Sequence, residues 1–173
     1  MSRGAVTRDA TYRGAATLAV LALIASLLQL GAVPALFLGS VAAPLLPVAL
    51  IAAWTMARGE RELWPALLVV AAVLGVASSE RVGWFLLALL PAAGLSAVIA
   101  ATLVSRRLAL APAAAALGAL AYLAVLATAG GGLDRLPAMS GSIAAAGAWT
   151  ALVAAVFALV LWPLQPRPGG LFE

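Results

Sequence analysis

Residues 82–104 read VGWFLLALLPAAGLSAVIAATLV, and the arginine pair Arg106 and Arg107 follows shortly after this stretch. The stretch contains no charged side chain, and as a helix rising 1.5 Å per residue it would be about 35 Å long. The hydrocarbon core of a bilayer is about 30 Å thick, so such a helix can cross it. A barrel strand would instead alternate apolar and polar residues. The stretch is therefore predicted to form a transmembrane helix.

The chain as a whole is predicted to be an all-α integral membrane protein, a bundle of about six transmembrane helices. Of its 173 residues, 65% are hydrophobic and only 9% are charged, whereas a soluble domain carries about 25% charged residues. The stretch at 63–79 is the shortest of the six. The other predicted spans are 15–33, 37–57, 82–104, 108–129 and 143–164.

Arginine distribution predicts the orientation, with both termini in the cytoplasm. The predicted organisation is a cytoplasmic tail at 1–14, a transmembrane domain at 15–164 and a second cytoplasmic tail at 165–173. Of the ten basic residues, only Arg81 and Arg135 then lie outside, which leaves eight inside. Short cytoplasmic loops rich in arginine are typical of inner-membrane proteins, and this bias also accounts for the pI of 11.1 without nucleic-acid binding. The predicted topology determinants within the loops are Arg58, Arg61, Arg106 and Arg107.

The residue types that are missing exclude several kinds of chemistry. The chain has no Cys and no His, so thiolate sites, His-ligated haem and ordinary zinc sites are excluded. A serine nucleophile would need a base, and neither His nor Lys is present. No acidic residue or arginine falls inside a predicted span, which disfavours a proton pump or an ion-coupled carrier. We therefore expect a non-enzymatic protein without a cofactor or a metal site.

Proline residues inside two predicted spans indicate irregular helices. Pro44 and Pro47 lie within 37–57, and Pro91, followed by Gly94, lies within 82–104. Each proline removes a helix hydrogen bond and is predicted to bend or open the helix. Broken helices line substrate cavities in many transporters, whereas lipid-embedded helices also tolerate simple packing kinks. Because no ionisable residue lies at these depths, the packing kink is favoured.

A few polar and aromatic side chains in the spans are candidates for specific contacts. Gln29 and Tyr122 are the better candidates for touching a ligand, because convergent polar groups are scarce. Most other polar side chains in the spans are expected to bond to backbone or to a neighbouring helix. Trp54 and Trp64 flank the charged loop 58–62 and are predicted to lie at the membrane interface, where an indole is half wet.

The order of these features resembles the MreD family, the small membrane subunit of the bacterial rod-shape machinery. The resemblance covers most of the chain and is one of pattern. The segments that carry it are Leu27–Leu28–Gln29, Pro34, Arg58–Gly59–Glu60–Arg61–Glu62, Gly75, Arg106–Arg107–Leu108 and the exit Ala158–Leu159–Val160–Leu161–Trp162–Pro163–Leu164. The family usually carries an Asp four residues after a Gly of the third span, but here Ser79 stands at that distance from Gly75. Glu80 is the acid that would replace it.

The resemblance implies a scaffold in the bacterial cytoplasmic membrane. Such a protein would bind an MreC-like partner and help to couple cell-wall synthases of the elongasome to the MreB cytoskeleton. Gly75, Ser79 and Glu80, together with Gln29 and Tyr122, are the candidate contacts to a partner or ligand. The alternative is the substrate-binding subunit of an energy-coupling-factor vitamin transporter, which the shortage of polar groups in the last three spans disfavours. An orphan multipass protein of another role also stays open.

Overall fold

A computed structural model of the chain describes residues 3–38, 42–78, 81–102, 108–130 and 137–164. Every regular element in these residues is helical, so the all-α prediction is confirmed for them. Single turns of 3-10 helix lie at η1 (Glu60–Glu62), η3 (Leu108–Leu110) and η5 (Trp162–Leu164). The α-helices are α1 (Arg3–Leu30), α2 (Ala32–Leu36), α3 (Leu46–Arg58), α4 (Leu63–Ala77), α5 (Val82–Thr102), α6 (Ala111–Ala129) and α7 (Ser140–Leu161).

Four helical segments are long and apolar enough to cross a membrane. They are Thr11–Leu36, Val82–Thr102, Leu108–Ala129 and Ser140–Leu161, and each overlaps one predicted span. These four segments mark the chain as a membrane protein. The remaining two predicted spans contain shorter helices. α4 has 15 residues and α3 has 13, which at 1.5 Å per residue makes them about 22 and 20 Å long.

The helical span predicted over 37–57, with a bend or opening at its two prolines, is wrong in its first part. α3 begins only at Leu46, and Pro44 lies before it in non-helical backbone. Pro47 stands in the first turn, where a missing N–H has no cost. If the helix ran on towards its N-terminus, the Pro47 ring would clash with the carbonyl of Ala43. The two prolines therefore set the start of a half-length helix and do not bend a longer one.

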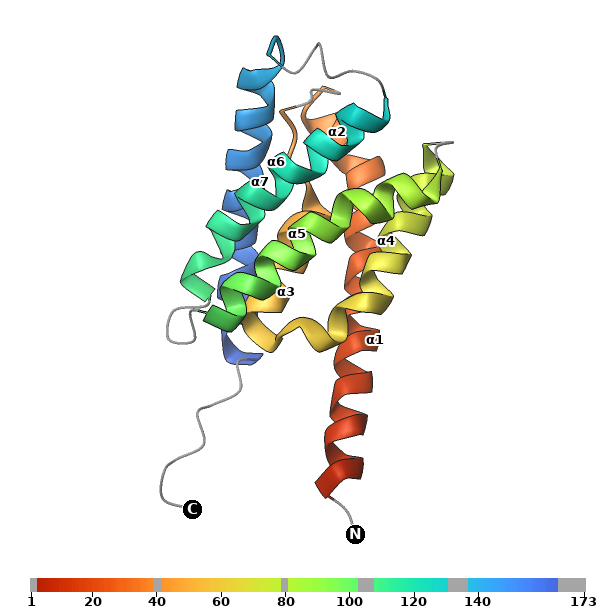
Figure 1. Cartoon of the computed structure of the whole chain (residues 1–173), viewed down its shortest axis with the longest axis vertical. Helices are drawn as coiled ribbons and strands as arrows, with labels where there is room; N and C mark the ends of the chain where they lie inside the picture. Colours follow the sequence, from red (N-terminus) through yellow and green to blue (C-terminus); the bar gives the residue numbers. More distant parts are fainter. Residues whose placement is uncertain (1–2, 39–41, 79–80, 103–107, 131–136, 165–173) are drawn as a thin grey trace.

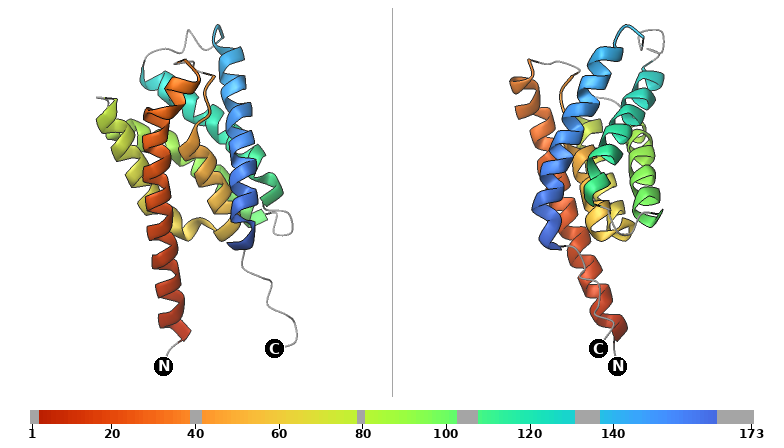
Figure 2. Two further views of the ribbon diagram at one scale, coloured as in Figure 1. Left: turned by 180° about the vertical axis from the view of Figure 1, so that it is seen from behind. Right: turned by 90° about the vertical axis from the view of Figure 1, so that its left-hand side faces the viewer.

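Helix α3 occupies the centre of the bundle. Every residue from Pro47 to Ala57 is buried, and α1, α5, α6 and α7 pack around it (Figure 1). Its small residues Ala49, Ala52 and Ala53 are almost completely inaccessible to solvent, which lets the neighbouring helices come close. The N-terminal turns of α1 project beyond the ends of the other helices (Figure 2). The tail predicted at 1–14 is thus helical from Arg3 onwards, and the tail at 165–173 lies outside the described residues.

Helix α5 is continuous through Pro91, which lies inside it as predicted. Further along, α5 meets α6 closely at Gly118. A Cβ built on Gly118 would lie 2.9 Å from the Cβ and 3.2 Å from the Cα of Ala92. Gly94 on α5 differs, because a Cβ there would meet nothing within 4 Å. Replacing each glycine with alanine therefore separates two effects on stability: the packing between helices at Gly118 and the helix propensity alone at Gly94.

We expect Gly118→Ala to destabilise the protein and Gly94→Ala to leave it unchanged or slightly more stable. Overpacking costs about 1–3 kcal/mol, and replacing a helical glycine with alanine returns at most about 1 kcal/mol. Thermal unfolding of the two variants in the same detergent measures the difference. Equal shifts in melting temperature would show that the α5–α6 contact is looser than this geometry.

Candidate functional site

The N-terminus of α3 is held by side chains from two other helices. The backbone N–H of Leu45 donates to Thr150 Oγ1 on α7 at 3.0 Å, and the N–H of Leu46 donates to Gln29 Oε1 on α1 at 2.8 Å. The first N–H groups of a helix have no partner within it, and an unpaired polar group in apolar surroundings costs free energy. Gln29 and Thr150 thus supply the capping contacts that the local sequence around Pro44 does not.

A small cavity lies beside this helix start. Its volume is about 10 Å³, which is roughly the room that one water molecule needs. Among the residues described, the Tyr122 hydroxyl and the Val48 N–H have no hydrogen-bond partner, although Tyr122 is only 5% exposed. The cavity is lined by Gln29, Leu45, Pro47, Val48, Leu74, Leu89 and Tyr122.

The structure therefore brings Gln29 and Tyr122 to one cavity. The sequence singled out each residue but did not predict that they lie together. The two residues come from α1 and α6 and are far apart in the chain. Gln29 already uses its carbonyl oxygen on the backbone of α3. Contact of either residue with a ligand stays a prediction.

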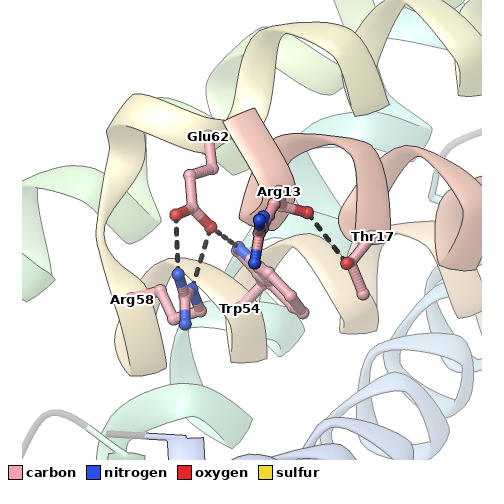
Figure 3. A network of polar contacts seen from close by, with 5 residues as sticks. All are labelled: Arg13, Thr17, Trp54, Arg58 and Glu62. Carbon is pink, nitrogen blue, oxygen red and sulfur yellow. Dashed lines mark hydrogen bonds and ion pairs between the residues drawn. The ribbon is translucent and has the colours of Figure 1, made fainter. Parts of the chain in front are cut away.

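The opposite end of α3 is fixed by the carboxylate of Glu62, in the turn η1 (Figure 3). Glu62 is 6% exposed. It accepts a hydrogen bond from Trp54 Nε1 and two from the guanidinium of Arg58, all at 3.0 Å. The Arg58 guanidinium also lies 5.7 Å from the centre of the Trp54 ring, within the range of a cation–π contact. A buried carboxylate with three donors is well compensated for its lost hydration.

Glycine at position 14 lets this carboxylate rest directly on α1. A Cβ built on Gly14 would overlap both carboxylate oxygens of Glu62. Nearby, Thr17 Oγ1 donates to the carbonyl of Arg13 at 2.8 Å, also on α1. The contact between Gly14 and Glu62 joins α1 to η1 and, through Arg58, to α3.

Sequence reasoning identified Arg58 as a topology determinant but missed its partner. The hydrogen bond from Arg58 to Glu62 raises the pKa of Arg58 above its ordinary value. Trp54, predicted to lie at the interface, is instead 2% exposed. Trp54 and Arg58 are four residues apart and neighbour each other on α3. Glu62 lies beyond the end of that helix, in η1, so helical spacing alone does not reveal it as their partner.

Of the other residues predicted from the sequence, some lie in the described structure and four lie outside it. A Cβ on Gly75 would lie 2.7 Å from the Cα of Val82, so Gly75 allows α4 to cross close to the start of α5. Pro91 and Gly94 lie on the exposed side of α5. Four predicted residues lie outside the described part of the chain: Ser79, Glu80, Arg106 and Arg107.

An open groove of about 370 Å³ lies between the beginning of α4 and the second half of α5. Arg61 lies at this groove, is exposed, and makes no ion pair with a described residue. The wall of the groove is mostly apolar. The lining residues are Glu60, Arg61, Leu63, Trp64, Leu67, Leu90, Ala93, Gly94 and Ala97.

Comparison of the chain with models of protein families, with curated proteins and with solved structures found no match. No relative therefore assigns a role to the contacts of α3 or to the groove. The resemblance to MreD stays an expectation from the sequence.

Thr150→Val should destabilise the protein more than Thr55→Val does. Both threonines are fully buried, and both donate to the carbonyl four residues earlier in their own helix. Only Thr150 also accepts from Leu45 N–H. Valine at 150 leaves that N–H unpaired, at a cost of about 1–2 kcal/mol beyond the loss in the control. Equilibrium unfolding in mixed micelles measures the difference, and equal losses would mean that the cap contributes nothing.

Glu62→Gln should destabilise the protein by about 1–3 kcal/mol, because an amide cannot accept hydrogen bonds with both terminal atoms and carries no charge for Arg58. Glu60→Gln, two residues earlier, is the matched control. Glu60 is exposed and makes no ion pair with a described residue, so its replacement should change stability by less than about 0.5 kcal/mol. Thermal unfolding of both variants decides this. A silent Glu62→Gln would contradict the anchoring role.

Proposed function

We propose that this chain is a non-enzymatic scaffold subunit of the MreD type in the bacterial cytoplasmic membrane. It binds an MreC-like membrane partner and supports peptidoglycan synthesis by the elongasome. The observation that carries this proposal is the fixation of α3 at both ends by the protein's own side chains. The side chains of Gln29, Thr150 and Glu62 are thereby used to hold the helices together.

Internal fixation suits a scaffold because a partner needs a surface of constant shape. Gln29 and Thr150 hold the start of α3, and Glu62 holds its end. A carrier must instead change shape around its substrate, and transporters keep free polar groups at their broken helices for that purpose. In this chain the N–H groups of Leu45 and Leu46 at the start of α3 are bonded to side chains of its own bundle.

The outer faces of α1 and α7 supply the surface for a partner. Large apolar side chains point outwards on both helices, where they meet either lipid or another transmembrane helix. The projecting turns of α1 add a second region for contact at the end of the bundle (Figure 2). The exposed apolar residues include Leu23, Ile24, Leu27 and Leu28 on α1, and Leu152, Val156, Leu159 and Val160 on α7.

The cavity beside Tyr122 weighs against a vitamin-binding role for Gln29 and Tyr122. Small-molecule sites usually measure about 300–1,000 Å³, whereas this cavity offers about 10 Å³. A vitamin between these two residues would require the start of α3 to move and to lose its contacts with Gln29 and Thr150.

Purification of the tagged chain from native membranes in mild detergent, followed by mass spectrometry, tests the proposal. We expect recovery of an MreC-like protein with a glycosyltransferase or a transpeptidase. Leu27→Trp on α1 and Leu159→Trp on α7 locate the interface, because a bulky residue on the correct face should lower partner recovery at least several-fold without changing the melting temperature. Recovery of paired ATPases with a coupling membrane subunit would overturn the scaffold and identify a transporter. Normal cell shape after depletion of the protein would also contradict it.

A further inference from the structure

The groove between α4 and α5 combines an apolar wall with a charged mouth. Leu67 lines it on α4, and Leu90 and Ala93 line it on α5. A Cβ on Gly94 would meet nothing within 4 Å, so the groove is open at this position. In a bilayer such a groove on the outside of a bundle is filled by acyl chains, which pack against it through van der Waals contacts. The chains are already in hydrocarbon, so this packing brings no hydrophobic gain and the preference among lipids rests on the headgroup.

The mouth of the groove carries two opposite charges side by side. Glu60 and Arg61 are adjacent and exposed, and neither forms an ion pair with any described residue. The neighbouring carboxylate Glu62 is already occupied by Arg58. Trp64, which also lines the groove, is 60% exposed, as expected of an indole at the depth of lipid headgroups.

We propose that this groove is a binding site for phosphatidylethanolamine. The acyl chain lies against α4 and α5, the phosphate binds the Arg61 guanidinium, and the primary ammonium donates to the Glu60 carboxylate. A headgroup of this kind places one anion and one N–H-bearing cation a short distance apart, which matches the two side chains in charge and in hydrogen-bonding type. This inference does not depend on the proposed scaffold role.

The same two charges disfavour the other common headgroups. An anionic phosphatidylglycerol would satisfy Arg61 but would leave Glu60 beside a second negative charge. Phosphatidylcholine has the correct charges, but its quaternary ammonium has no N–H to donate to Glu60. Selectivity should therefore depend on Glu60, and affinity for the phosphate should depend on Arg61.

Native mass spectrometry of the full chain tests the site with an equimolar mixture of the three lipids carrying identical acyl chains. We expect phosphatidylethanolamine to be retained at least about threefold over each of the others. Arg61→Gln should lower the retention of phosphatidylethanolamine, and Glu60→Gln should remove the preference for it. Gly94→Leu should lower retention of all three lipids by filling the groove. Arg81→Gln, which removes an exposed arginine outside the groove, is the matched control and should change nothing.

Equal retention of the three lipids, or a preference for phosphatidylglycerol, would overturn the proposal. Undiminished retention in Gly94→Leu would show that the lipid binds elsewhere. A photo-crosslinker at Leu90, an exposed residue of the groove, that captures a polypeptide from native membranes and no lipid would assign the groove to a protein and would equally overturn it. Melting temperatures recorded without added lipid verify that each variant is folded.

Discussion

The unpaired backbone N–H groups at the start of α3 impose the constraint on which the rest of the bundle depends. Backbone polar groups inside a membrane bundle have no water to bond to and must find partners in the protein. α3 begins in the interior, at Leu46, because Pro44 and Pro47 prevent an earlier start. Its N–H groups therefore require Gln29 from α1 and Thr150 from α7. These bonds fix the height of both helices relative to α3.

Helix α1 brackets α3, because it contacts both of its ends. Gln29 accepts a hydrogen bond from the start of α3. At the other end of α3, Arg58 binds the carboxylate of Glu62, which rests on Gly14 of α1. The two positions on α1 are about 22 Å apart at 1.5 Å per residue, and α3 is about 20 Å long. This match of lengths explains how a half-length helix is held in place by one long antiparallel neighbour. It also explains why the carboxylate of Glu62 is buried although it lies in a turn.

The sequence predicted the four long apolar helices, because length and hydropathy alone determine whether a segment can cross the lipid. It predicted less about α3, since prolines at 44 and 47 fit a kinked span as well as a late helix start. Gln29 and Tyr122 were recognised as unusual for their polarity, but the cavity that brings them together depends on tertiary packing. Glu62 was missed because a charged residue in a short loop is normally solvated. Its burial depends on Gly14, on another helix, which leaves room for the carboxylate, and no local pattern reveals that pairing.

The groove follows from the same set of contacts. Gly75 brings the end of α4 against Val82 at the start of α5, so the two helices meet at that end of the pair. At its other end, α4 is drawn towards α1, because Glu62 immediately before it rests on Gly14. α5 instead packs on α6 and α3, and the two helices diverge from their common end (Figure 1). The carboxylate of Glu62 thus belongs to two parts of the structure. It holds the end of α3 through Arg58 and Trp54, and it ties the start of α4 to α1 at the end of the helix pair where the groove lies.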